Sequence, residues 1–178
     1  ARAAGDRTGE LLARVGAADY RCLFEIDPAV DELEVLARKT LPLLEQSGDH
    51  AGLAYIWRVL GYSVANFRGR NDDWADAAEQ AVGHARLAGR HTTSLLGLDE
   101  ALVYGPRPAD EALRTLDRLL PENPHPFALL CRAWLLAMLA RFDEAAQVAQ
   151  EGGDRFRDLT GDDPGHVFLG PIAATAGD

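Results

Sequence analysis

Ala140-Arg141-Phe142-Asp143-Glu144-Ala145 joins two amphipathic stretches of the chain, and related joints occur upstream. Pro108-Ala109-Asp110-Glu111-Ala112 repeats its Asp-Glu-Ala core, and Asp73-Trp74-Ala75-Asp76-Ala77 repeats the spacing from an aromatic residue to an alanine. The last alanines of the three joints are 35 and 33 residues apart. A period near ~34 residues is typical of helical hairpins repeated along a chain. The sequence therefore predicts an all-α fold, a right-handed superhelical stack of antiparallel helical hairpins.

A second repeated pattern, Gly-Asp-x-x-Gly, marks the ends of the expected helices. It occurs as Gly5-Asp6-Arg7-Thr8-Gly9, Gly48-Asp49-His50-Ala51-Gly52 and Gly161-Asp162-Asp163-Pro164-Gly165. Glycine can take the left-handed conformation that ends a helix, and the following aspartate can cap the next one. Each copy therefore predicts a helix stop joined to a helix start.

Apolar residues at helical spacing fill the segments between these joints. One stripe is Leu33, Leu36, Ala37, Leu41 and Leu44. Such patterns indicate helices with one buried face. We expect helices at 7–25, 29–47, 50–69, 72–88, 91–104, 107–120, 125–140 and 143–159, and a short segment at 166–176. The units of a single repeat domain over residues 1–178 are then about 5–47, 48–88, 89–124, 125–160 and a partial 161–178. Pro42, inside an expected helix, should kink it or release a backbone carbonyl.

Composition limits the classes of function. The net charge of −10 disfavours direct contact with nucleic-acid phosphates. The two cysteines, Cys22 and Cys131, lie in apolar helical patterns, which favours buried free thiols over a disulfide or a zinc site. We find no apolar run of ~18 residues and no signal peptide, and we expect a cytoplasmic protein without membrane partners. The start at Ala1, without an initiator Met, suggests the middle of a longer protein.

Several residues resemble the tetratricopeptide repeat. Trp57-x-x-Leu60-Gly61 matches the opening of its consensus, although Val64 replaces the consensus tyrosine. Ala77, Ala112 and Ala145 match the small residue where the two helices of a hairpin touch. Further matches, four residues on and at the end of a repeat, are Ala81, Leu116, Ala149 and Pro124.

The chain also resembles a narrower group, the repeat region of large actinobacterial regulators. The segments that carry this resemblance are Ala88-Gly89, residues 102–108 (Leu-Val-Tyr-Gly-Pro-Arg-Pro) and Arg141-Phe142-Asp143-Glu144-Ala145. In that group a nucleotide-cyclase-like or DNA-binding domain precedes an AAA-type ATPase, and helical repeats follow. The resemblance implies a part of a signalling or transcription regulator. The cyclase and ATPase domains themselves have no counterpart among these residues.

Motifs for catalysis are missing from the sequence. It has no phosphate-binding loop, no His-Glu-x-x-His pattern and no Gly-x-Ser-x-Gly setting for a nucleophile. The acidic pairs Asp72-Asp73 and Asp162-Asp163 lack the spacing of a calcium loop, and helix capping is the better interpretation. We therefore expect no enzyme activity, no cofactor and no metal.

The positive signal is a surface that binds a protein or peptide, including another domain of the same chain. In tetratricopeptide repeats the first helix of each hairpin lines the concave face. Projecting this register gives the candidate concave residues Tyr55, Arg58, Tyr62, Asn66, Ser94, Tyr104, Phe127, Leu130, Trp134 and Met138. Aromatic residues and arginine are common binding anchors. The alternative for Phe127 and Trp134 is packing between hairpins, and for Tyr62 it is sealing a helix joint.

Two other functions remain open at this stage, a small-molecule sensor that binds an inducer on the concave face and a purely structural spacer. A closed pocket lined by the aromatic residues would favour the sensor, and an open acidic groove would favour a basic peptide. The incomplete unit at 161–178 leaves Val167, Phe168 and Ile172 half covered, so self-association through this end is also expected.

Overall fold

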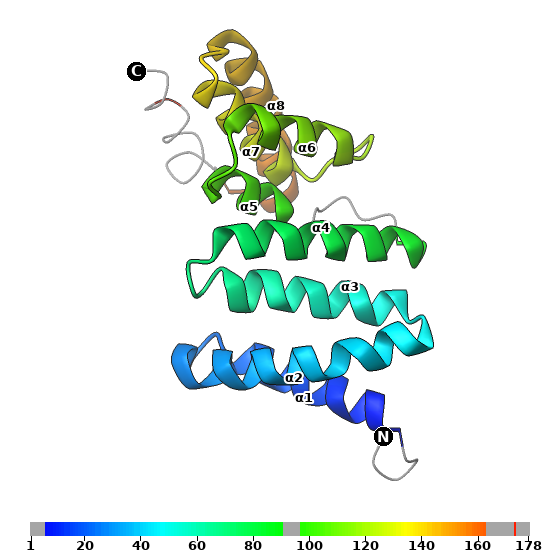
Figure 1. The fold of residues 1–178 in the computed structure, drawn as a ribbon. Helices are drawn as coiled ribbons and strands as arrows, with labels where there is room; N and C mark the ends of the chain where they lie inside the picture. The colour runs from blue at the N-terminus through cyan, green and yellow to red at the C-terminus, as the bar shows by residue number, and fades with distance from the viewer. Residues whose placement is uncertain (1–5, 91–96, 163–172, 174–178) are drawn as a thin grey trace. The chain divides into compact units, whose positions relative to one another are not determined.

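The computed structural model describes residues 6–90, 97–162 and 173, and nearly all of these residues are helical (Figure 1). No strand occurs in these ranges, which confirms the all-α class. The chain divides into two compact units, Ala1–His91 and Thr92–Asp178, and each is described by itself. None of the described helices is long and apolar enough to cross a membrane.

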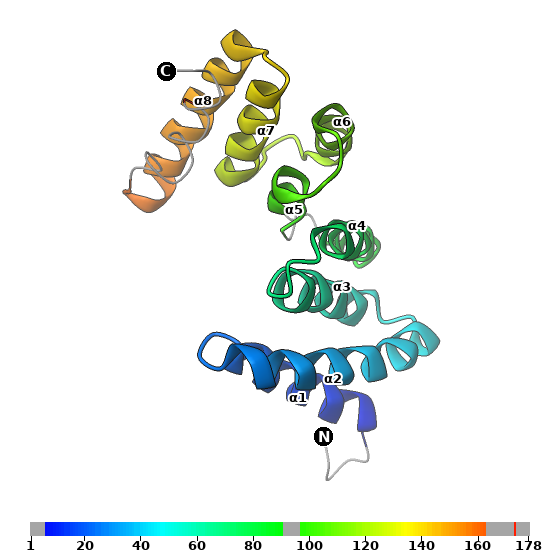
Figure 2. The same cartoon turned by 60° about the vertical axis from the view of Figure 1, so that its left-hand side comes forward.

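Unit 1 is a layered set of helices. It contains α1 (Arg7–Arg21), α2 (Ile26–Ser47), α3 (His50–Arg58), the π-helix η2 (Val59–Ala65) and α4 (Asn71–Leu87). α1 packs on α2, α2 on α3 and η2, and α3 and η2 on α4. Figures 1 and 2 show α3 and α4 side by side, joined by a short connection.

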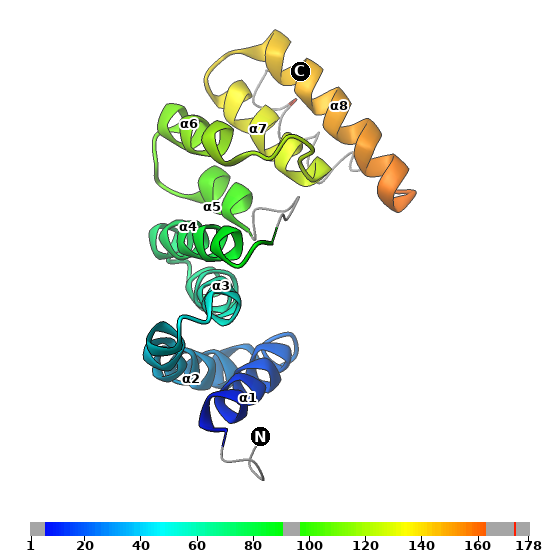
Figure 3. The same cartoon turned by 90° about the vertical axis from the view of Figure 1, so that its right-hand side faces the viewer.

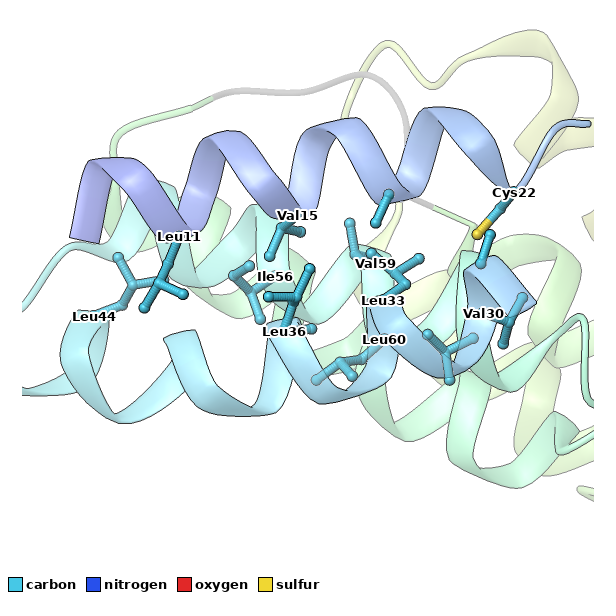
Figure 4. Packing of buried hydrophobic residues seen from close by; sticks show 14 of the residues in the cluster. Leu11, Val15, Cys22, Val30, Leu33, Leu36, Leu44, Ile56, Val59 and Leu60 are labelled. Atoms are coloured by element: carbon cyan, nitrogen blue, oxygen red, sulfur yellow. The ribbon is translucent and has the colours of Figure 1, made fainter. Parts of the chain in front are cut away.

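The core of unit 1 lies where α1, α2, α3 and η2 meet (Figure 4). Its residues fall at the helical spacing expected from the sequence, so one stripe of each helix is buried. Cys22 is among them as a free thiol, as predicted, and Cys131 of unit 2 is likewise free and buried. The fully buried members with large side chains are Val15, Leu33, Leu44, Ile56 and Val59.

Unit 2 contains α5 (Leu98–Tyr104), α6 (Ala109–Leu119), α7 (Pro126–Met138) and α8 (Phe142–Thr160). α7 lies against α8, as Figure 3 shows, and also packs on α5 and α6. Small residues on α8 permit its close approach to α7. Ala145 is 2% exposed, and a Cβ on Gly152 would lie 3.1 Å from the Cβ of Leu129. Ala112 on α6 is also buried, so the alanines of these two joints occupy packed positions.

The joints between helices follow the chemistry of the Gly-Asp pattern. Gly48 is left-handed with φ 65°, and the Asp49 carboxylate accepts a 2.9 Å hydrogen bond from the Gly52 N–H at the start of α3. Asp6 caps α1 in the same way, and Gly161 ends α8 with φ 76°. The predicted helix stop and start are therefore confirmed at Gly48-Asp49, and Gly5 lies outside the described residues.

Some expected boundaries were wrong. α1 ends at Arg21 rather than at residue 25, because the N–H groups of Phe24 and Glu25 both turn back to the Arg21 carbonyl. α2 begins at Ile26 instead of 29 and continues through Pro42, so the Arg38 carbonyl loses its helical donor, as expected. The helix expected at 50–69 is α3 followed by η2. Residues 91–96 and most of the segment 166–176 lie outside the described residues.

Candidate binding surfaces

A polar cluster ties α1 to the junction of α3 and η2 in unit 1. Asp19 of α1 accepts a 2.8 Å charge-assisted bond from the Arg58 guanidinium and a 2.5 Å hydrogen bond from the Ser63 hydroxyl. The guanidinium carbon of Arg58 also lies 5.4 Å from the centre of the Tyr55 ring. We call Asp19, Tyr55, Arg58 and Ser63 the Asp19 cluster.

The π-helix makes this cluster possible. The Asn66 N–H donates across five residues to the Gly61 carbonyl at 3.0 Å, the bond that defines a π turn. Arg58 precedes η2 and Ser63 lies within it, five residues further on. In an α-helix, residues five apart point to different sides, whereas the wider π turn brings them closer to one side. One carboxylate can therefore receive both side chains.

The guanidinium of Arg58 is paired with a carboxylate of the same chain. Its partner Asp19 is largely buried, so the pair serves first as a link between helices. Burial, and then Asp19, raise the pKa of Tyr55, against the opposing effect of Arg58. Tyr62 is exposed and meets Trp74 edge-on, with ring centres 6.0 Å apart. This contact agrees with the sealing role that the sequence left open for Tyr62, and the nearby Asn66 is half-buried.

Unit 2 carries a more open aromatic surface. Tyr104, the last residue of α5, is 53% exposed and meets half-buried Trp134 of α7 edge-on, with ring centres 5.5 Å apart. Met138 lies one turn after Trp134 and is 43% exposed. Glu100 lies one turn before Tyr104 and is half-buried. We call Glu100, Tyr104, Trp134 and Met138 the Tyr104 surface.

Three other residues predicted for the concave face are not exposed parts of the Tyr104 surface: one is buried, one is half-buried and one is not described. Leu130 is only 1% exposed and belongs to the core, because the α7 position one turn before Trp134 faces the packed interior. Assigning it to a binding face was therefore wrong. Phe127 is half-buried near the start of α7, and Ser94 lies outside the described residues.

Two consecutive carboxylates of α5, Asp99 and Glu100, give the region of the Tyr104 surface its charge. Asp99 is buried, and its burial raises its pKa despite hydrogen bonds from backbone N–H groups and the field of His125. Burial, and then Asp99, also raise the pKa of Glu100. Burial first, and then both carboxylates, raise the pKa of the Cys131 thiol well above its usual value. This part of unit 2 is therefore locally acidic, and its thiol is held in the unreactive neutral form.

Sequence inspection missed Glu100 and Asp19. Glu100 had a usable signal, since its spacing of four residues from Tyr104 places both on one face of a helix. Asp19 had none, because its partners lie 39 and 44 residues away.

Two hollows lie apart from both surfaces. The hollow in unit 1 has a volume of about 560 Å³ and a lining of apolar and charged residues. It is lined by Arg38, Trp57, Leu60, Val64, Ala65, Arg70, Asp73, Asp76, Ala77, Glu79 and Gln80. The hollow in unit 2, of about 630 Å³, is lined by Asn123, Pro124, His125, Pro126, Arg155, Asp158 and Leu159.

Across the described ranges, no group of three or more His, Cys, Asp or Glu side chains is arranged to hold a metal ion. Comparison of the chain with models of known protein families, with curated proteins and with solved structures finds no match. The candidate sites of this chain are therefore the Asp19 cluster, the Tyr104 surface and the two hollows.

Proposed function

We propose that this chain is a stack of antiparallel hairpins of the tetratricopeptide type, with a right-handed superhelical course, that holds a protein or peptide partner. The buried alanines at 77, 112 and 145 support the repeat, since they recur with its period at packed positions. The helix joints at Gly48-Asp49 and Ala140-Arg141 support it as well. In such a stack, α5 and α7 are the first helices of successive hairpins, whose inner faces bind partners.

The observation that carries the proposal is the Tyr104 surface. It exposes a tyrosine and a methionine next to a half-buried tryptophan on two helices, although burying these side chains would be favourable. Aromatic side chains are enriched at the centres of protein interfaces, and methionine adapts to varied partners. An exposed surface of this kind suits an extended peptide or a partner helix better than an enclosed small molecule.

The setting we propose is a cytoplasmic bacterial regulator in signalling or transcription. The support is the resemblance of residues 102–108 and 141–145 to the repeats of large ATPase-containing regulators. The partner is then another domain of the same chain or a second protein. The repeat region contributes recognition and no catalysis.

The test is a selection of short peptides from a random display library, with the protein immobilised. We expect binders whose affinity falls at least about tenfold in Tyr104→Ala, because the exposed ring offers a large contact area to a partner. Phe142→Ala is the matched control, since Phe142 is also an exposed aromatic residue of unit 2 and lines neither hollow. Equal loss of affinity in both variants, or a selection without binders, would refute the proposal.

A small-molecule sensor is the second candidate, favoured by the hollow of about 560 Å³ in unit 1. Its volume lies in the range of small-molecule sites, and Trp57 supplies an aromatic wall. Thermal unfolding in the presence of a panel of metabolites tests it. A ligand of this hollow should raise the melting temperature of the wild type and not that of Gln80→Trp, which places a large side chain in the hollow from an exposed lining position.

A further inference from the structure

We infer that the Tyr104 surface takes a positively charged segment of its protein partner, with an arginine or lysine side chain that pairs with Glu100 and lies against the rings of Tyr104 and Trp134. The inference rests on the proposed function and names the chemistry of the partner.

The geometry brings two kinds of cation recognition together. Glu100 and Tyr104 are one turn apart on α5, and Tyr104 touches Trp134 of α7. An aromatic face attracts a guanidinium or ammonium group, and Trp is the strongest of the aromatic partners. A carboxylate adds a charge-assisted hydrogen bond to the same group. A cation at this surface would therefore satisfy both interactions at once.

Four arginines of unit 2 pair with other carboxylates. Arg132 of α7 pairs with Asp117 of α6 at 2.7 Å, and Arg114 pairs with Asp110 within α6 at 2.9 Å. Arg141 and Arg155 pair with glutamates of α8. Among the residues that the structure describes, no arginine or histidine forms an ion pair with Glu100. Glu100 is therefore a half-buried carboxylate without an ion-pair partner among the described residues, and a cationic side chain of a partner can fill that role.

A cation from a partner would also make ionisation of Glu100 more favourable. Burial and Asp99 make ionisation of Glu100 unfavourable, and this raises its pKa. An incoming ammonium or guanidinium favours the ionised form, so binding and deprotonation support each other. Affinity should then rise as pH increases through the raised pKa of Glu100. A purely apolar segment would leave this carboxylate desolvated without compensation, and an acidic one would be repelled.

The selection described above also tests this inference. We expect arginine and lysine to be enriched in the selected peptides relative to the starting library. The tightest selected peptide is then the probe, together with a version in which each arginine or lysine is replaced by glutamate. The basic peptide should bind the wild type at least about tenfold more tightly than its acidic version.

Variants of the protein locate the effect. Glu100→Gln should weaken the basic peptide roughly tenfold and reduce the salt dependence of binding. Glu122→Gln, which removes an exposed charge of unit 2 elsewhere, should leave affinity unchanged. Circular dichroism verifies that both variants fold. If Glu100→Gln does not fold, the inference is tested by the affinities of the wild type for the basic peptide and for its acidic version.

The outcomes separate the two proposals. Peptides that bind without a basic bias, or that bind Glu100→Gln as well as the wild type, would overturn the cationic partner and leave the binding surface intact. A selection that yields no binders would overturn the binding surface itself, and the cationic partner with it.

Discussion

The Nδ1 atoms of His50 and His84 lie 3.0 Å apart, which joins the first residue of α3 to the last turn of α4. The ring centres are 5.2 Å apart, so the two Nδ1 atoms lie between the rings and face each other. One ring must donate its N–H while the other accepts on a bare nitrogen. Two protonated rings would set two donors against each other, so the contact requires at least one neutral histidine.

Mild acid should therefore destabilise unit 1. Burial, and then His50, lower the pKa of His84, and Glu45 of α2 opposes the shift. A histidine with a lowered folded pKa contributes stability that is present above its unfolded pKa of about 6.5 and is lost as pH falls towards the folded value. The free energy of unfolding, measured in urea, should fall between about pH 7.5 and pH 5.5.

His84→Gln is the control for this experiment. Asp99 and Glu100, whose pKa values are raised, change stability with the opposite sign, but they do so equally in both proteins. The difference between wild type and variant therefore isolates the histidine pair. An identical pH dependence in the two proteins would contradict the assignment.

Ala145→Asp should unfold the packing of α7 on α8. Ala145 is buried where the two helices meet, so the substitution places an unpaired carboxylate in an apolar joint. We expect a loss of roughly 3 kcal/mol or more in the free energy of unfolding. Ala146→Asp makes the same change at the next, exposed position and should cost much less. Equal losses would show that the register of α8 is wrong.

Ala140→Gly should leave the protein at least as stable, or stabilise it by up to about 1 kcal/mol. Ala140 has φ 57°, a left-handed conformation that costs an L-residue about 1–2 kcal/mol and costs glycine almost nothing. The greater freedom of glycine in the unfolded chain offsets about 0.4–1 kcal/mol of that gain. Ala146→Gly, within α8, should instead destabilise by about 1 kcal/mol. Chemical denaturation of both variants checks the opposite signs.

Asp19→Ala should loosen α1 from the rest of unit 1. It removes the acceptor of both Arg58 and Ser63, and a part-buried group that loses its partner costs about 1–3 kcal/mol. Asp19→Asn keeps an acceptor and should lose less. Glu32→Ala, which breaks the exposed contact with Arg21, should cost at most about 1 kcal/mol. Similar values for Asp19→Ala and Glu32→Ala would mean that the cluster has no structural role.

The candidate surface could be predicted only in part. The positions of Tyr104, Trp134 and Met138 follow from helical spacing, and all three retain exposure in the structure. Leu130 obeys the same spacing and is nevertheless buried, because α7 is packed on three other helices and little of its circumference remains open. A pattern along one helix does not say how many neighbours surround it.

The sequence by itself determined the helical class and the joints of this protein. Glycine tolerates the positive φ that ends a helix, aspartate caps the next helix, and apolar residues recur every three to four positions. Each of these effects operates within a few residues of the chain. Only the tertiary structure decided that Asp19 meets Arg58 and Ser63, that residues 59–65 widen into a π-helix, and that His50 faces His84. The side-chain contacts among these features join residues more than 30 positions apart in the chain, and no local pattern encodes such pairs.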